Sequence, residues 1–218
     1  MTAKIQVDNS LPHLIANDIT ERIMNQQLQP GEQLREGEVS DRFGTSRAPV
    51  REAFYLLEVA GLIERLPRRG CRVKAYSWSE MIDIVELRNV MELLALKRYT
   101  PKTAAPHLKN MQEILRSMEE RFTEDDKEAY SHLNQQFHRC IIRFSGSKLI
   151  ETHYSRLSAP LRVLINKSWE GETLDQSIKD HQQIVKTLLE EDIEKAAEIL
   201  SVHNLATITR LKKHYQSS

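Results

Sequence analysis

The sequence predicts a mainly α-helical protein with three helices and a β-hairpin in residues 1–76 and an antiparallel all-α bundle in residues 77–218. Two patterns support this prediction. Apolar residues recur at helical spacing along most of the chain. This pattern is interrupted between residues 62 and 74 by two runs of strand length. We therefore expect two domains, with the boundary after residue 76.

Composition and charge exclude several classes of protein. The 218 residues are 40% hydrophobic and 28% charged with a formal net charge of zero, and no run approaches the roughly 18 apolar residues that a membrane span needs. The first ten residues lack the apolar core of a secretory signal, and Cys71 and Cys140 are too few for a disulfide framework. We expect a cytoplasmic protein that does not enter the membrane.

The first 61 residues predict three helices. One runs from about Leu11 to Leu28 and is stopped by Pro30-Gly31, and a shorter one covers 36–43. After a turn at Gly44, Ser46 is expected to cap the third helix through its hydroxyl. The apolar spacing of that helix predicts an inward stripe, which leaves residues 46–48 and Arg51 at its outward N-terminal end.

A basic hairpin follows these helices. Two short runs, 62–65 and 71–74, flank Pro67-Arg68-Arg69-Gly70, and three helices with such a hairpin make a winged helix-turn-helix. Residues 42–76 contain eight Lys and Arg against three Glu, a local excess of five positive charges. A helix end carrying Arg and small side chains is suited to the major groove, and a basic wing to the phosphates.

The rest of the chain predicts a helical bundle. Ser77 and Glu80 form a capping box before a helix that runs to about Thr100, where Pro101 is expected to close it. Further helices are expected at 106–121, 126–145, 148–167, 174–190 and 193–213. Short connections between long amphipathic helices favour antiparallel packing.

Three histidines fall on inward faces of these helices. His181 and His203 share their faces with apolar residues, and Asn134 lies four residues before His138, hence on the same face. Side chains from three helices could therefore meet inside the bundle, where metal and cofactor sites are commonly built. Two hypotheses stay open: a divalent metal site, or a metal-free pocket whose His and Asn side chains bind an effector directly.

Several motifs resemble known regulators. The runs LREGEVSDRFG (34–44), SRAPVREA (46–53), LLEVAGLI (56–63) and RRGCRV (68–73) resemble the DNA-binding domain of the GntR family of transcription regulators. The run ELRNVME (86–92), Phe137-His138, Asp180-His181 and His203 resemble the FCD ligand-binding domain of the FadR-type branch. The resemblance covers nearly the whole chain and is strongest over 34–74.

The resemblance implies a homodimer that binds a pseudo-palindromic double-stranded operator, most often as a repressor, and that responds to a small-molecule effector such as an organic acid. It differs from the type member at Gly37, where that protein has arginine, so the operator sequence should not be carried over. The expected DNA-binding residues are Arg35, Ser46, Arg47, Ala48, Arg51, Arg68, Arg69 and Gly70.

The resemblance also implies a metal and an effector site. Metal-binding members hold a divalent ion with three His and an Asp, and here Asn134 stands in place of the Asp, beside His138, His181 and His203. An amide oxygen brings no charge, so binding of Zn²⁺ or Ni²⁺ is expected to be weaker. The effector-binding candidates are Arg88, Glu92 and Arg162. Arg88 resembles the family's pocket-facing arginine; the alternative is a surface pair between Arg88 and Glu92.

Two other functions fit the same residues. Asn134 and the three His around Zn²⁺ could activate water in a metal-dependent hydrolase, although the sequence shows no general-base Glu beside them and no nucleophile. A winged helix can also serve as a protein-interaction module. The arginines on the expected DNA-binding face argue against that module, and we expect a regulator rather than an enzyme.

Overall fold

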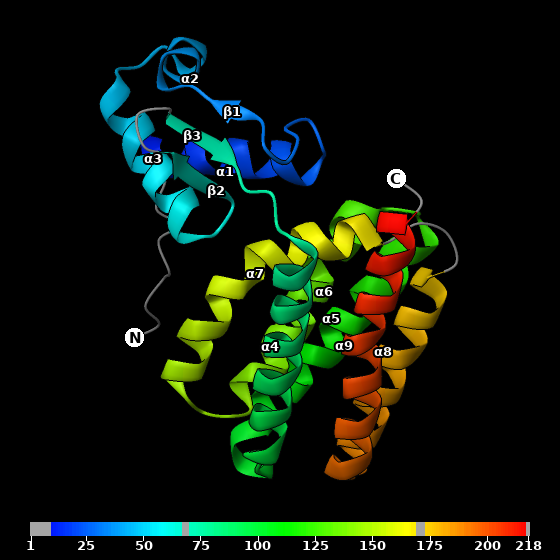
Figure 1. Cartoon of the computed structure of the whole chain (residues 1–218). Helices are drawn as coiled ribbons and strands as arrows, with labels where there is room; N and C mark the ends of the chain where they lie inside the picture. Colours follow the sequence, from blue (N-terminus) through cyan, green and yellow to red (C-terminus); the bar gives the residue numbers. More distant parts are fainter. Residues whose placement is uncertain (1–9, 67–69, 169–172, 217–218) are drawn as a thin grey trace, which may run out of the picture. The chain divides into compact units, whose positions relative to one another are not determined.

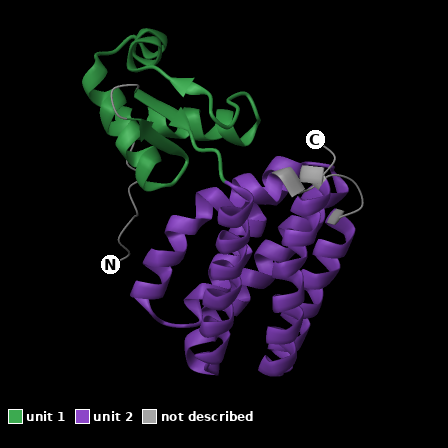
Figure 2. Ribbon diagram, viewed as in Figure 1, with its two compact units in different colours: residues 1–76 green, residues 77–218 purple. Residues whose placement is uncertain are grey.

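The computed structural model describes residues 10–66, 70–168 and 173–216. The chain divides into two compact units, an N-terminal unit of residues 1–76 and a C-terminal unit of residues 77–218 (Figure 2). None of the described helices is both long enough and apolar enough to cross a membrane.

In its described residues, the N-terminal unit consists of three helices and a small antiparallel sheet (Figure 1). Its elements are α1 (Leu11–Met24), β1 (Gln33–Leu34), α2 (Glu36–Phe43), α3 (Arg47–Val59), β2 (Ile63–Leu66) and β3 (Gly70–Val73). The strand order is β1-β3-β2, and the hairpin pairs Ile63 with Val73 and Leu66 with Gly70. This is the winged helix-turn-helix that the sequence predicts.

The inward stripe of α3 forms the core of this unit. Val50, Phe54 and Leu57 are buried on α3, and they face Ile15 and Ile19, which are buried on α1. Burial of each large aliphatic or aromatic side chain stabilises the fold by roughly 1.5–3 kcal/mol. Because this stripe faces the core, the opposite side of α3 is left exposed.

Two local predictions in this unit were wrong, and one strand was missed. Helix α1 ends at Met24, because Gln26 adopts a φ of 57° that breaks the helix, and Leu28 is buried from the following loop. Ser46 occupies the N-cap position of α3 but makes no side-chain capping bond. Strand β1 was not predicted, because two residues are too few to show a period and are held by pairing with β3.

The C-terminal unit is an all-helical bundle. Its helices are α4 (Trp78–Lys97), α5 (Pro101–Thr123), α6 (Lys127–Arg143), α7 (Lys148–Ser168), α8 (Thr173–Leu189) and α9 (Ile193–Gln216). Helix α9 packs against both α4 and α8, which run beside it in Figure 1, and α5 packs against α6. The predicted capping box at Ser77 and Glu80 is confirmed by reciprocal bonds between the two residues.

The start of α5 corrects another prediction. The sequence suggested that Pro101 ends one helix and that the next begins near residue 106. Instead, α4 already ends at Lys97, and Pro101 is the first residue of α5, after Thr100 as N-cap. Proline is favoured at that position because the first-turn N–H groups have no intrahelical partner. Pro106 therefore lies inside the helix.

Replacement of Gly44 by Ala should destabilise the protein. Gly44 adopts a φ of 59° between α2 and α3, and a Cβ there would meet no atom within 4 Å, so the cost is conformational. We expect a loss of about 1–2 kcal/mol in the free energy of unfolding, measured by urea denaturation. The control is Gly37→Ala, at a helical position without a steric conflict. Equal stability of the Gly44 variant and the wild type would contradict this account.

Candidate functional site

The N-terminal end of α3 presents the residues that the sequence assigned to DNA. Ser46, Arg47, Ala48 and Arg51 are all exposed, while the other face of the helix is buried. Gly44 places this end directly after α2 through a left-handed turn. The arrangement exposes two guanidinium groups and small side chains at a helix N-terminus, which allows close approach to a major groove.

Two arginines on this side of the unit are held by carboxylates. The Nε of Arg51 donates to Oε2 of Glu36 over 2.8 Å, and Nη1 of Arg35 donates to Oε1 of Glu38, also over 2.8 Å. Within the described part of the chain Arg47 makes no ion pair. Exposed pairs of this kind contribute little to stability, so their main effect is on side-chain orientation.

The wing is formed by β2 and β3. Gly70 is exposed at the first position of β3 with a φ of 82°. A Cβ there would lie 3.7 Å from the carbonyl oxygen of Leu34, which is an ordinary contact. The basic residues Arg68 and Arg69 lie outside the described residues.

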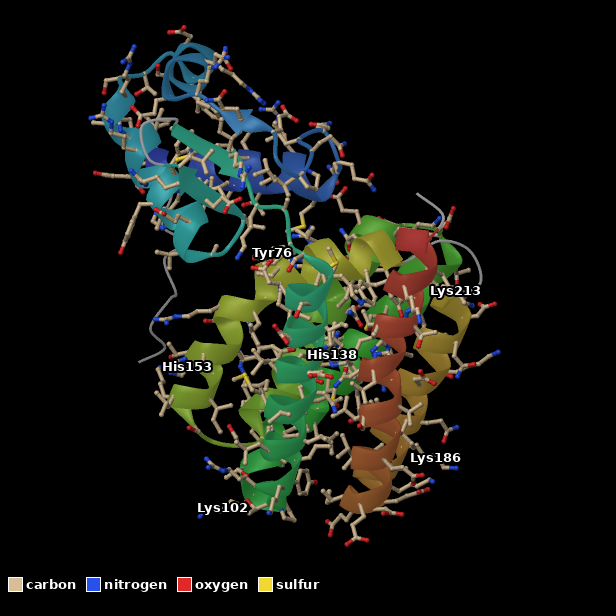
Figure 3. The ribbon with its side chains drawn as sticks, in the orientation of Figure 1. Tyr76, Lys102, His138, His153, Lys186 and Lys213 are labelled. Carbon is tan, nitrogen blue, oxygen red and sulfur yellow. The ribbon has the colours of Figure 1, made fainter. Side chains whose placement is uncertain are left out.

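The second candidate site is the histidine cluster in the C-terminal unit. His138 from α6, His181 from α8 and His203 from α9 are buried, and one ring nitrogen of each lies within 4.8 Å of the others. The two Nε2 atoms of His138 and His181 are 3.2 Å apart. Figure 3 shows His138 in the interior of the bundle. The convergence follows from the inward faces of three separate helices.

Two carboxylates orient two of the three histidine rings through their Nδ1 atoms. Nδ1 of His138 lies 3.0 Å from Oε2 of Glu92, and Nδ1 of His203 lies 3.1 Å from Oδ2 of Asp180. A carboxylate at Nδ1 favours the tautomer that carries its proton there, which leaves the Nε2 lone pair free. Nδ1 of His181 has no partner within the described residues.

The three histidine side chains of the cluster are uncharged. Burial lowers the pKa of His138 to about 3 and holds the pKa of His181 well below its usual value. Burial also lowers the pKa of His203, although Asp180 opposes this effect. All three imidazoles are thus deprotonated near neutral pH, which is the form that binds metals.

Glu92 is the central polar residue of the bundle. Its side chain is fully buried and accepts bonds from Arg88 Nε at 3.0 Å, Tyr154 OH at 2.6 Å and Asn204 Nδ2 at 2.8 Å, besides its contact with His138. Burial alone would raise the pKa of Glu92, but the contacts with His138 and Arg88 outweigh it and hold this pKa well below the usual range. The carboxylate is therefore ionised.

The pair between Arg88 and Glu92 corrects one alternative. The sequence suggested that an i, i+4 pair of these residues would lie on the surface, but the two side chains are 3% and 0% exposed. Arg88 also lines an internal cavity, so the two readings that the sequence left open describe one buried arrangement.

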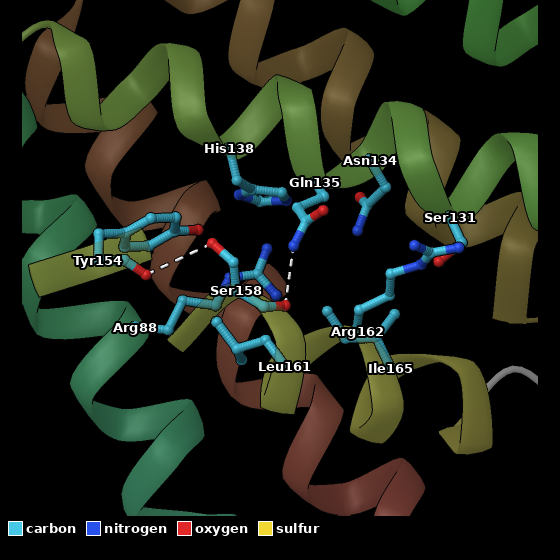
Figure 4. A pocket seen from close by; sticks show the side chains of 10 residues that line it. All are labelled: Arg88, Ser131, Asn134, Gln135, His138, Tyr154, Ser158, Leu161, Arg162 and Ile165. Carbon is cyan, nitrogen blue, oxygen red and sulfur yellow. Dashed lines mark hydrogen bonds between the residues drawn. The ribbon is translucent and has the colours of Figure 1, made fainter. Parts of the chain in front are cut away.

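This cavity adjoins the histidine cluster. It measures about 20 Å³, which is room for roughly one water molecule. Figure 4 shows the side chains around it, contributed by α4, α6 and α7. They are Arg88, Ser131, Asn134, Gln135, His138, Tyr154, Ser158, Leu161, Arg162 and Ile165. Asn134 Oδ1 and Arg162 Nε are buried there without a partner in the described residues.

The structure thus brings Arg88, Glu92, Asn134, His138 and Arg162 around one cavity or into direct contact with its lining. The sequence analysis assigned no role to Tyr154, Asn204 or Asp180, which orient or pair with these groups. Asp180 precedes His181 and could have been noticed as a second carboxylate. No pattern in the sequence singles out Tyr154 or Asn204.

Comparisons with known proteins identify both domains. A model of the bacterial regulatory proteins of the gntR family matches residues 13–73, and a model of the FCD domain matches residues 83–206. A probable D-xylose utilization operon transcriptional repressor of Paenarthrobacter nicotinovorans is 25% identical, covering 93% of this chain and 89% of its own. The gluconate operon transcriptional repressor of Bacillus subtilis is 25% identical over 87% of this chain and 79% of its own.

A solved structure shares the fold. The crystal structure of a putative GntR transcriptional regulator from Rhodococcus superposes with a TM-score of 0.81 at 19% identity, covering 93% of this chain and 97% of its own.

The fold, the exposed N-terminal end of α3 and the buried histidine cluster, together with these relatives, define a DNA-binding transcription regulator with a ligand-binding helical domain. The chain belongs to the GntR family, and its C-terminal unit contains an FCD domain. Its relatives are transcription regulators rather than enzymes, so neither the hydrolase nor the interaction-module alternative is favoured.

Removal of the Glu92 carboxylate should strongly destabilise the C-terminal unit. Glu92→Ala leaves the buried Arg88 guanidinium without its counter-charge, and we expect a loss of about 3–5 kcal/mol in the free energy of unfolding. Denaturant titration followed by circular dichroism measures this loss. Glu86→Ala, at an exposed position of the same helix, is the control and should change stability by about 0.5 kcal/mol or less. Similar losses in both variants would refute the central role of Glu92.

Proposed function

We propose that this regulator is a metal-dependent repressor that binds its operator as a homodimer and responds to a small organic acid in the C-terminal unit. The observation that carries the proposal is the carboxylate-oriented histidine cluster, which adjoins a cavity lined by Arg88 and Arg162. The relatives that are named repressors of sugar and gluconate operons support both the sign of regulation and the class of effector.

The histidine cluster fits a divalent metal. Zinc holds tetrahedral nitrogen ligands at about 2.0–2.1 Å, which places two ligands of one ion about 3.4 Å apart. The 3.2 Å between Nε2 of His138 and Nε2 of His181 is close to that separation. His203 is the third nitrogen donor, and the unpartnered Oδ1 of Asn134 is the candidate fourth donor. Nickel accepts the same nitrogen ligands.

This donor set carries no charge of its own. Three neutral imidazoles and an amide oxygen bind a divalent ion less tightly than a set that includes a carboxylate. A bound metal would offer a positive centre to an effector carboxylate. Arg162 is the second group for such a carboxylate, because its buried Nε has no partner in the described residues, whereas Arg88 is already paired with Glu92.

The small cavity has a consequence for regulation. At about 20 Å³ it cannot hold an organic acid unless the surrounding side chains or helices move. An effector would therefore bind an opened form of the unit better than the closed form. Such a difference in affinity is what allows a ligand to shift a regulator between two states.

A homodimer is supported by an apolar stripe on α4. Leu87, Val90 and Leu94 lie on one side of this helix and are 51%, 61% and 38% exposed. Exposed apolar stripes of this kind commonly mark protein interfaces. A second copy would cover the stripe and supply the twofold symmetry that a palindromic operator requires.

In the N-terminal unit we assign base and phosphate contacts to the exposed end of α3 and to the wing. Ser46, Arg47, Ala48 and Arg51 would enter the major groove, and Arg35 would lie beside them. Arg68, Arg69 and Gly70 would contact phosphates from the wing. Arg47 is the main candidate for base recognition, because its guanidinium makes no ion pair with any described residue.

Loss of the Arg47 side chain should weaken specific DNA binding. We expect Arg47→Ala to cost about 1–3 kcal/mol in binding of the preferred duplex, measured by fluorescence anisotropy after selection of that duplex from genomic fragments. Arg68→Ala should instead reduce the salt dependence by about one counterion. Arg116→Ala, exposed on α5 in the other unit, is the matched control and should bind as the wild type does. Unchanged operator affinity in Arg47→Ala would remove this residue from the interface.

Loss of one histidine should abolish metal retention. Wild-type protein incubated with Zn²⁺ and desalted is expected to retain one zinc per chain and to unfold at a higher temperature than the metal-free protein. His181→Ala should retain no zinc and show no thermal stabilisation. His153→Ala, at an exposed position of α7 labelled in Figure 3, is the control and should behave as the wild type. Zinc retention by His181→Ala would rule out the cluster as the metal site.

A further inference from the structure

The first turn of α2 contacts the arginines of α3. Glu36 is the first residue of α2, and its Oε2 accepts a bond of 2.8 Å from Nε of Arg51, which follows Arg47 by one helical turn. The next residue is Gly37, and a Cβ at that position would lie 3.9 Å from Nη2 of Arg47. The guanidinium of Arg51 thus lies beside Glu36, and that of Arg47 lies beside Gly37.

The atom of Arg51 that Glu36 contacts determines which N–H donors of Arg51 remain available to DNA. Guanidinium carries five N–H donors in a plane, one on Nε and two on each Nη. A bond at Nε leaves Nη1 and Nη2 free as a parallel pair. That pair matches the O6 and N7 acceptors of guanine, the commonest specific contact of arginine in the major groove.

Arg35 provides a contrast within the same unit. Its ion pair with Glu38 uses Nη1, so one arm of its outer pair is already occupied. The side chains of Arg35 and Glu38 are each 65% exposed. Arg35 therefore keeps a positive charge near the DNA but not a free pair of donors for one base.

The charges, like the geometry, favour a contact of Arg51 with a base over a contact with a phosphate. Glu36 cancels the charge of Arg51, and phosphate binding depends on the number of positive charges that displace counterions. An arginine neutralised in this way gains little from phosphates, yet its Nη pair keeps its hydrogen bonds for a base. The ion pair is half exposed, with 63% and 32% of the side chains accessible, so it contributes little to folding.

We propose that Glu36 is a positioning residue that makes Arg51 a reader of guanine, so that Glu36 adds sequence specificity while lowering affinity for DNA in general. This inference rests on the proposed DNA-binding role of the α3 end. It assigns Arg51 to a base and Arg35 to a phosphate, and it gives a carboxylate a positive role in binding a polyanion.

The test compares base preferences. The full-length wild type, Glu36→Ala, Arg51→Ala and the double variant are each used to select duplexes from a random library. Binding to the selected duplex and to a random duplex is then measured at two salt concentrations. Glu21→Ala is the matched control, since it makes the same change of charge at an exposed position of α1 in the same unit. Circular dichroism melts establish that each variant is folded.

We expect Arg51→Ala to lose the preference for one G·C pair in each half-site, by on the order of tenfold. Glu36→Ala should lose most of the preference at the same pair, because it removes the acceptor that holds Nε, and should bind random DNA at least as tightly as the wild type. The double variant should lose no more than Arg51→Ala. Preferences at the remaining pairs, including the one that Arg47→Ala affects, should persist in Glu36→Ala.

Three results would overturn the inference. Glu36→Ala could keep the preference at that pair and gain affinity equally for both duplexes, which would make Glu36 a simple repulsive charge. Arg51→Ala could weaken both duplexes equally, which would make Arg51 a phosphate contact. If neither Arg47→Ala nor Arg51→Ala changed binding to any duplex, the proposed DNA-binding surface itself would be wrong.

Discussion

The carboxylate of Glu92 is the buried charge on which the arrangement of the C-terminal bundle depends. Its partners come from four helices: Arg88 on its own α4, His138 on α6, Tyr154 on α7 and Asn204 on α9. A buried carboxylate without such partners would cost several kcal/mol. The helices must therefore approach so that every donor reaches it. The same contact sets the tautomer of His138 and turns its Nε2 toward His181, so stability of the bundle and geometry of the cluster have a common origin.

Arg and Glu pairs have opposite uses in the two units, and burial decides between them. The pair of Arg88 and Glu92 is almost fully buried, so each charge needs the other and neither is free for a new partner. The pair of Arg51 and Glu36 is half exposed, so it adds little to stability and leaves the outer face of the guanidinium accessible. The first pair organises a core, whereas the second leaves hydrogen-bonding groups available to a ligand.

Much of the fold could be predicted because its signals are local. Helix α2 was predicted at its observed bounds, since Gly44 ends it with a left-handed residue. The inward placement of His138, His181 and His203 followed from helical spacing alone. Predictions failed where a distant part of the chain decided the outcome. Strand β1 is held by its pairing with β3. Leu28 is buried in the core, but it reaches the core from a loop and not from a helix. The prediction at Pro101 failed for another reason, because proline occurs both after the end of a helix and at its first position.

The sequence by itself determined the family, the succession of helices and the faces on which the arginines and histidines lie. These properties depend on residues within a turn or two of each other, so periodicity and motif spacing suffice to predict them. Tertiary structure alone decided the environment of each charge. Glu92 meets partners 46, 62 and 112 residues away, and no spacing rule describes such contacts. Whether an arginine is buried against a carboxylate or exposed beside one depends on how distant helices pack, because packing sets the desolvation that each charge must offset.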